Sequence, residues 1–159
     1  MKYKEIVKLW SDSRTAWFEY NISVGMAAGK VFNNIKEIME VEDRLIRLIN
    51  PDDDDEKVSK TEYSPVGAII KDNDGWTRFG ILLTLETDKN TFPKNNYKFI
   101  PRIKRTNNGW KVKFFQDSEE IQISTEITKD DVEPIVQEIE KMMRQQFENS
   151  INRWLSQEN

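Results

Sequence analysis

The sequence predicts an α+β fold in one domain, residues 1–159. It comprises a long N-terminal helical segment, an antiparallel β-meander of four to five strands and a long C-terminal helix. Changes in apolar spacing predict these parts. A helical period runs through residues 1–49, a two-residue alternation runs through residues 63–126, and a helical period returns over residues 130–156. Helices on either side of a run of strands are typical of the α+β class.

The composition argues against several kinds of chemistry. The chain has no cysteine and no histidine, and its net charge is −4. It therefore lacks disulfides, thiolate chemistry, and the most common general base and metal ligand. No apolar run approaches the roughly 20 residues that span a bilayer. We therefore expect a cytoplasmic protein without a signal peptide, membrane contact, metal or cofactor.

The N-terminal segment repeats apolar residues at every seventh position. Such a stripe belongs to one long helix or to two helices in near register. The repeat comprises Tyr3, Trp10, Trp17, Val24, Val31, Ile38 and Leu45. Ser13 and Asn34 weaken its companion seam. Asn50 and Pro51 are predicted to end the segment, because proline lacks an amide hydrogen and disfavours helix at the preceding residue.

The stretch SVGMAAGKVF, residues 23–32, raises the question of a phosphate-binding loop. Three residues separate its glycines where a Walker loop has four, and Lys30 is followed by Val31 instead of a hydroxyl residue. We therefore interpret the stretch as a smooth helix surface or as a break between two helices. Because so long an apolar stripe needs a partner, we expect a homodimer through the N-terminal helices. The predicted interface comprises Trp10, Trp17, Val24, Gly25, Ala28, Gly29 and Val31.

An acidic segment, residues 51–60, follows the helical part. Its four adjacent aspartates repel one another, which favours an exposed loop. The aspartates lack the alternation and the glycine of a calcium-binding loop. We therefore predict no metal site there.

Alternating residues in the middle of the chain predict five strands joined by tight turns. Asp74-Gly75 and Asn108-Gly109 are typical hairpin turns. Pro101 cannot donate to a ladder, so its strand is predicted to be an edge or to carry a bulge there. The strands are predicted at residues 64–72, 75–87, 96–105, 109–116 and 119–125.

The C-terminal segment carries a broad apolar face at helical spacing. Asp130 or Asp131 is predicted to cap this helix. Pro134 is predicted to lie in its first turn, where a missing amide hydrogen costs nothing.

Basic residues are concentrated in one part of the chain. Residues 89–116 contain eight basic residues and no acidic one. The Asn-Gly turn places Lys104 opposite Lys111 on the predicted hairpin. The same register places Arg102 opposite Lys113. Because like charges directly across a ladder destabilise it, we expect something to compensate them.

We predict a non-catalytic protein-binding or assembly module that self-associates through its helices and presents this basic face to an acidic partner. Nucleic acid is the alternative ligand, with Phe115 and Trp76 as stacking rings. A solvated face, or one neutralised within the fold, is the remaining possibility. The predicted binding residues are Lys98, Arg102, Lys104, Lys111, Lys113 and Phe115.

A metal-dependent nuclease is a more remote reading. Glu86 and Lys89 lie near a predicted strand end, and Asp74 would have to supply the second carboxylate from a turn. The order of these residues does not match a nuclease pattern clearly. Serine or threonine nucleophiles lack both a histidine and a Gly-x-Ser-x-Gly turn. We therefore expect no enzyme.

Overall fold

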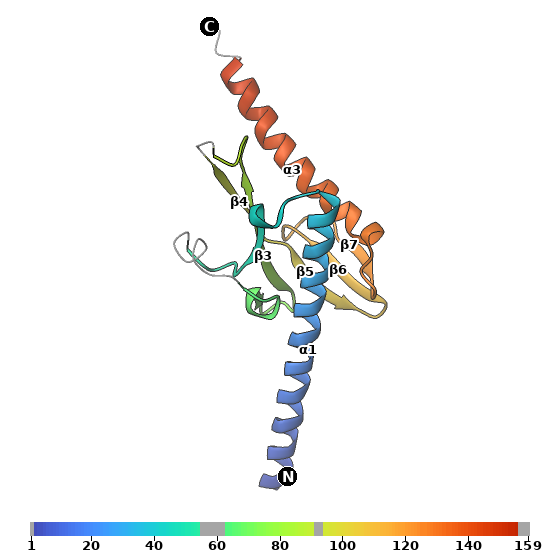
Figure 1. Cartoon of the computed structure of the whole chain (residues 1–159). Coiled ribbons are helices and arrows are strands. Elements are labelled where there is room, and N and C mark those ends of the chain that lie inside the picture. The colour runs from blue at the N-terminus through green and yellow to red at the C-terminus, as the bar shows by residue number, and fades with distance from the viewer. Residues whose placement is uncertain (1, 55–62, 91–93, 156–159) are drawn as a thin grey trace.

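The computed structural model describes residues 2–54, 63–90 and 94–155. It confirms the α+β fold: along the chain, one long helix precedes and another follows the strands of a seven-stranded antiparallel sheet (Figure 1). The helices are α1 (Tyr3–Ile38) and α3 (Lys129–Leu155). The strands are β1 (Ile46–Ile49), β2 (Ile69–Lys71), β3 (Thr77–Leu85), β4 (Asn95–Phe99), β5 (Arg102–Thr106), β6 (Gly109–Lys113) and β7 (Ile121–Ser124).

The long strand β3 organises the sheet. It pairs with β1 and β2 along one side and with β4 and β5 along the other, and β6 and β7 follow β5. The predicted strand over residues 96–105 is therefore two strands. Both keep one register against β3, so the ladder has no bulge at Pro101. Pro101 accepts a hydrogen bond from the Phe79 amide at 3.1 Å but has no amide hydrogen to return, which interrupts the ladder.

Both predicted hairpin turns are confirmed. Gly75 has a φ of +86°, a conformation that favours glycine, and the Asp74 carboxylate accepts the Trp76 amide at 3.1 Å. The second turn sets Thr106 opposite Gly109. The residue pairs of β5 and β6 that follow this turn therefore have the register that the sequence predicts.

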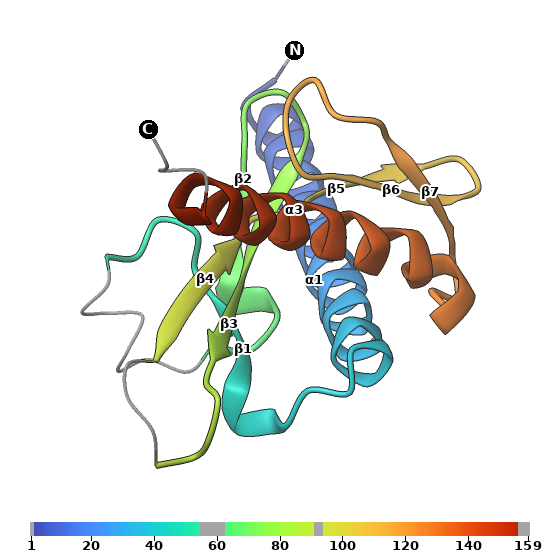
Figure 2. The same ribbon diagram turned by 90° about the horizontal axis from the view of Figure 1, so that it is seen from above.

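Both helices cover the same face of the sheet. Alternate residues of the strands, such as Phe79, Ile103 and Val112, form one buried core with α1 and α3. The two helices also pack on each other, and α3 crosses α1 when the molecule is seen from above (Figure 2). The opposite face of the sheet carries the other set of alternating side chains.

The helical prediction for residues 1–49 is wrong beyond Ile38. Glu40 adopts a positive φ of 54°, and the chain then enters β1. β1 pairs with β3, Ile46 opposite Leu83. Its short apolar run fits a buried strand as well as a helix, so its spacing alone did not distinguish the two.

α1 is one continuous helix across its glycines. A Cβ atom on Gly25 would lie 2.8 Å from Val66 Cγ2, and one on Gly29 would lie 2.8 Å from Pro65 Cγ. The smooth surface therefore receives the chain's own segment before β2. It does not face a second helix.

The C-terminal helix is confirmed, but its start differs in two respects. Thr128, not Asp130 or Asp131, is the capping residue: its hydroxyl accepts the Asp131 amide at 3.3 Å. The Asp131 carboxylate accepts the Thr128 amide in return at 2.9 Å, which completes a capping box. Pro134 lies in the second turn, not the first, on the exposed side of α3.

Gly25→Ala is expected to destabilise the fold by about 1–3 kcal/mol through overpacking against Val66. On an uncovered helix surface, the same change would stabilise the protein by about 1 kcal/mol. The sign of the stability change therefore shows whether Val66 packs on α1. Urea unfolding measures the difference. A stabilised variant would show that the segment at Val66 does not rest on α1.

Candidate functional site

The sheet face away from the helices carries a row of basic side chains. Arg78 lies opposite Arg102, and Arg102 lies opposite Lys113 on the next strand. Lys104 lies opposite Lys111, as the sequence predicts. We call these five residues the basic face.

Three lysines of the basic face converge on one indole ring. The Nζ atoms of Lys113, Lys111 and Lys104 lie 4.3, 5.2 and 5.8 Å from the centroid of Trp76. Only 6% of Trp76 is exposed, and Lys113 is itself buried. The ring attracts each ammonium group, but the three charges lie within about one Debye length (~10 Å) of one another and repel.

The fold neutralises part of this charge. Lys111 forms an ion pair with Glu120 at 3.2 Å, and Lys113 donates to the Gln116 carbonyl at 3.1 Å. Arg102 and Lys104 differ from Lys111: among the described residues, neither of them forms an ion pair. The face therefore keeps uncompensated positive charge at its centre.

Two carboxylates at the edge of the basic face neutralise the charge of Arg78. It forms ion pairs with Asp72 at 2.9 Å and with Asp52 at 3.3 Å. Its pKa is raised, chiefly by the hydrogen bond to Asp72. Asp52 belongs to the predicted acidic loop, most of which lies outside the described residues. Sequence reasoning missed this role of Arg78, although its spacing from Trp76 along the strand indicates the same face.

Two predicted binding residues lie apart from the indole. Lys98 on β4 donates to the Asp53 carbonyl at 3.2 Å. Phe115 is 62% exposed and lines a groove of ≈ 480 Å³ between β4 and α3, which Lys98 and Met142 also line. β6 ends at Lys113, and a turn that begins at Phe115 and is closed by Ser118 follows it. Phe115 thus lies with Lys98 at this groove, whereas Lys104, Lys111 and Lys113 are the cations near the Trp76 ring.

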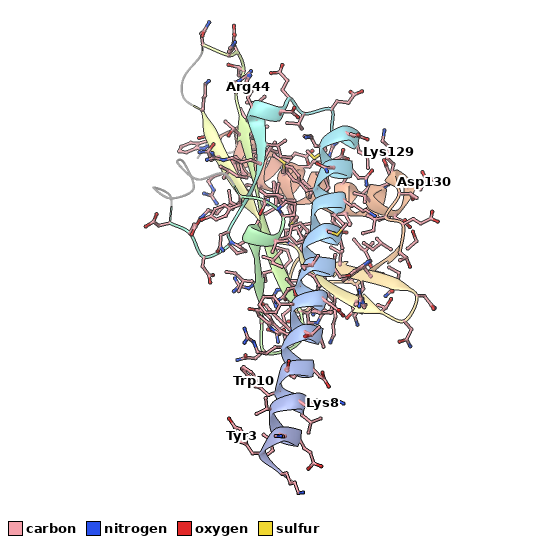
Figure 3. All side chains as sticks on the ribbon, turned by 60° about the horizontal axis from the view of Figure 1, so that its bottom comes forward. Tyr3, Lys8, Trp10, Arg44, Lys129 and Asp130 are labelled. Carbon is pink, nitrogen blue, oxygen red and sulfur yellow. The ribbon has the colours of Figure 1, made fainter. Side chains whose placement is uncertain are left out.

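The predicted dimer interface separates into two parts. Trp10 and Trp17 are 58% and 50% exposed, and Trp10 lies on the part of α1 that projects from the body (Figure 3). The other five residues are buried within this chain, so they are not available to a second copy as predicted. These five are Val24, Gly25, Ala28, Gly29 and Val31.

The nuclease residues do not assemble. Asp74 and Glu86 lie at opposite ends of β3, whose nine residues span roughly 30 Å. Both Glu86 oxygens are engaged, one by Arg44 and the other by Lys94 at 2.9 Å. These bases lower the pKa of Glu86 to about 2, with the Arg44 hydrogen bond as the largest cause.

No protein-family model matches the chain, and no curated protein and no solved structure matches it either. Within the described ranges, no group of three acidic side chains is placed to hold a metal ion. Over the same ranges, neither helix is apolar enough to cross a bilayer.

The Glu86→Gln substitution is expected to lower the free energy of unfolding by an amount that depends on pH. A carboxylate with a lowered pKa stabilises the folded state above its usual pKa of 4.5, and this contribution disappears as the pH falls toward about 2. The difference in free energy of unfolding between the two proteins should therefore shrink across that window. Urea unfolding at several pH values measures it, with the exposed Glu133→Gln on α3 as the control. A difference that stays constant from neutral to acid pH would contradict the ion pairs.

Proposed function

We propose that the chain is a non-catalytic binding module whose basic face receives an acidic segment of a protein partner. The observation that carries this proposal is the convergence of Lys104, Lys111 and Lys113 on Trp76, next to Arg102. Like charges placed directly across a ladder destabilise the sheet. A site that retains this charge gains more from an anionic ligand than a neutral surface does.

The fold itself favours a short carboxylate ligand over a long polyanion. Arg102 and Lys104 are two residues apart on β5, about 7 Å, and the facing lysines lie about 5 Å away on β6. Asp52 and Asp72 border the face beside Arg78, and Glu120 borders it beside Lys111. These carboxylates repel a continuous phosphate backbone but leave the centre open to two or three side chains of an extended peptide.

The position of Trp76 also supports a protein ligand. Binding of single-stranded nucleic acid uses exposed rings on which bases stack. Trp76 is covered by the lysines, so its ring is not presented to a base. The ring instead holds the ammonium groups in place, which reduces the entropy lost when an anion binds.

A labelled hexaglutamate peptide tests the proposal at low salt. We expect it to bind, and to bind more weakly as salt rises, because exposed charges are screened. Lys104→Glu and Arg102→Glu should each weaken binding by about tenfold, equivalent to ~1.4 kcal/mol. Both side chains are partly exposed, so neither change opens the core. Fluorescence anisotropy measures the affinity.

Lys141→Glu is the matched control, because it makes the same charge change at an exposed position on α3. It should leave peptide binding unchanged. A single-stranded oligonucleotide of equal length is measured in parallel. Tighter binding of the oligonucleotide would replace the proposal with nucleic-acid recognition. Binding of neither probe would show that the face is neutralised within the fold.

A further inference from the structure

The part of α1 outside the body carries an apolar seam that the described residues leave largely exposed. Residues 3–19, here the α1 extension, are exposed throughout (Figures 1 and 3). The seam continues the stripe that α1 buries against the sheet from Val24 to Ile35. Its residues Tyr3, Ile6, Trp10 and Trp17 are 79%, 50%, 58% and 50% exposed.

The uncovered area is large enough for a stable contact. Val7 and Leu9, 38% and 57% exposed, flank the seam. Taking about 200 Å² for an aromatic side chain, the seam and its flanks expose roughly 600 Å². Two copies would bury about 1,200 Å², which lies in the range of specific interfaces.

We infer that the α1 extension pairs antiparallel with the α1 extension of a second copy. The sizes of the seam residues select the register in which Trp10 lies opposite Ser13. In that register Ile6 lies opposite Trp17, and the large indole at position 10 fills the space that the small Ser13 leaves. This alternation of large and small residues is what knobs-into-holes packing requires. Ser13, which interrupts the stripe within one chain, thereby acquires a role between two chains.

A parallel pair would pack less well. It would set Trp10 against Trp10 and Ser13 against Ser13, so that one layer would be overfilled and another underfilled.

The distribution of charge also favours the antiparallel pair. Residues 2–10 carry three lysines against one glutamate, whereas residues 11–20 carry two acids against one arginine. Antiparallel pairing brings unlike halves together, and it also sets the two helix dipoles in opposition.

The length of the α1 extension fits the same arrangement. It is about 25 Å long, and the body begins at Tyr20, whose ring centroid lies 4.8 Å from the Nζ atom of Lys71. In the proposed register, the first turn of the second α1 reaches this point. A groove of ≈ 300 Å³ lies there, lined by Trp17, Asn21, Val66 and Ile69 among others. The two bodies lie at opposite ends of the helix pair, so they do not collide.

The pairing is independent of the basic face. The α1 extension contributes no residue to the surface around Trp76, and the basic face contributes none to the seam. Loss of self-association therefore leaves peptide binding testable, and loss of peptide binding leaves the molecular mass testable.

Trp10→Glu is expected to convert a dimer to a monomer. Sedimentation or light scattering should give twice the 18.8 kDa of one chain for the native protein and the single-chain mass for the variant. Trp10 is exposed in one copy, so the substitution leaves the core intact, and an unchanged melting curve at low concentration verifies this. Thr15→Glu adds the same carboxylate on the opposite side of α1 and should remain dimeric. A native protein that stays monomeric at high concentration, or a dimeric Trp10→Glu, would overturn the pairing.

The direction of the pair is read by cysteine cross-linking, because the chain has no cysteine of its own. Ile6→Cys and Trp17→Cys are prepared separately and oxidised alone and as a mixture. Only the mixture should form a disulfide-linked dimer, since a disulfide needs Cα atoms within about 7 Å. In the antiparallel pair, equal positions are separated by roughly 16 Å along the helices. Cross-linking of each variant alone would show a parallel pair, and cross-linking of none would exclude this register.

Discussion

The burial of α1 between Val24 and Ile35 is the contact on which the rest of the structure depends. The sheet covers one side of this stretch, and the segment at Pro65–Val66 covers its glycine side. The same helix is therefore a core element over about its last four turns and an exposed rod before them. Because helix formation is cooperative, the buried stretch also holds the exposed residues in helical register.

The two faces of the sheet carry different kinds of side chain. One face joins both helices in a single apolar core, and the other carries Trp76 with the lysines around it. Strand alternation separates these sets residue by residue. Charge can therefore accumulate on the outer face without entering the core, at the expense of repulsion that Asp52, Asp72 and Glu120 offset in part.

The two proposed surfaces would act together in an assembly. An antiparallel pair joined through the α1 extensions holds its two bodies apart at the ends of the helices, each with its own basic face. A partner with two acidic segments would then meet two sites at a fixed separation. The second contact becomes intramolecular, which raises the apparent affinity without any new contact at either site. Weak single sites are sufficient in such an arrangement.

Local signals determined what the sequence alone could predict. The Asp-Gly and Asn-Gly turns set the hairpins, so the register of Arg102 and Lys104 against their facing lysines followed from a few neighbouring residues. The C-terminal helix followed from its apolar period. Contacts between distant segments decided the rest. The end of α1 and the strand β1 depend on pairing with β3, and the partner of Gly25 is Val66. An apolar stripe indicates a surface that can pack against a partner, but not which segment covers it or whether the same chain does. Only the tertiary structure separated the buried half of α1 from the exposed half.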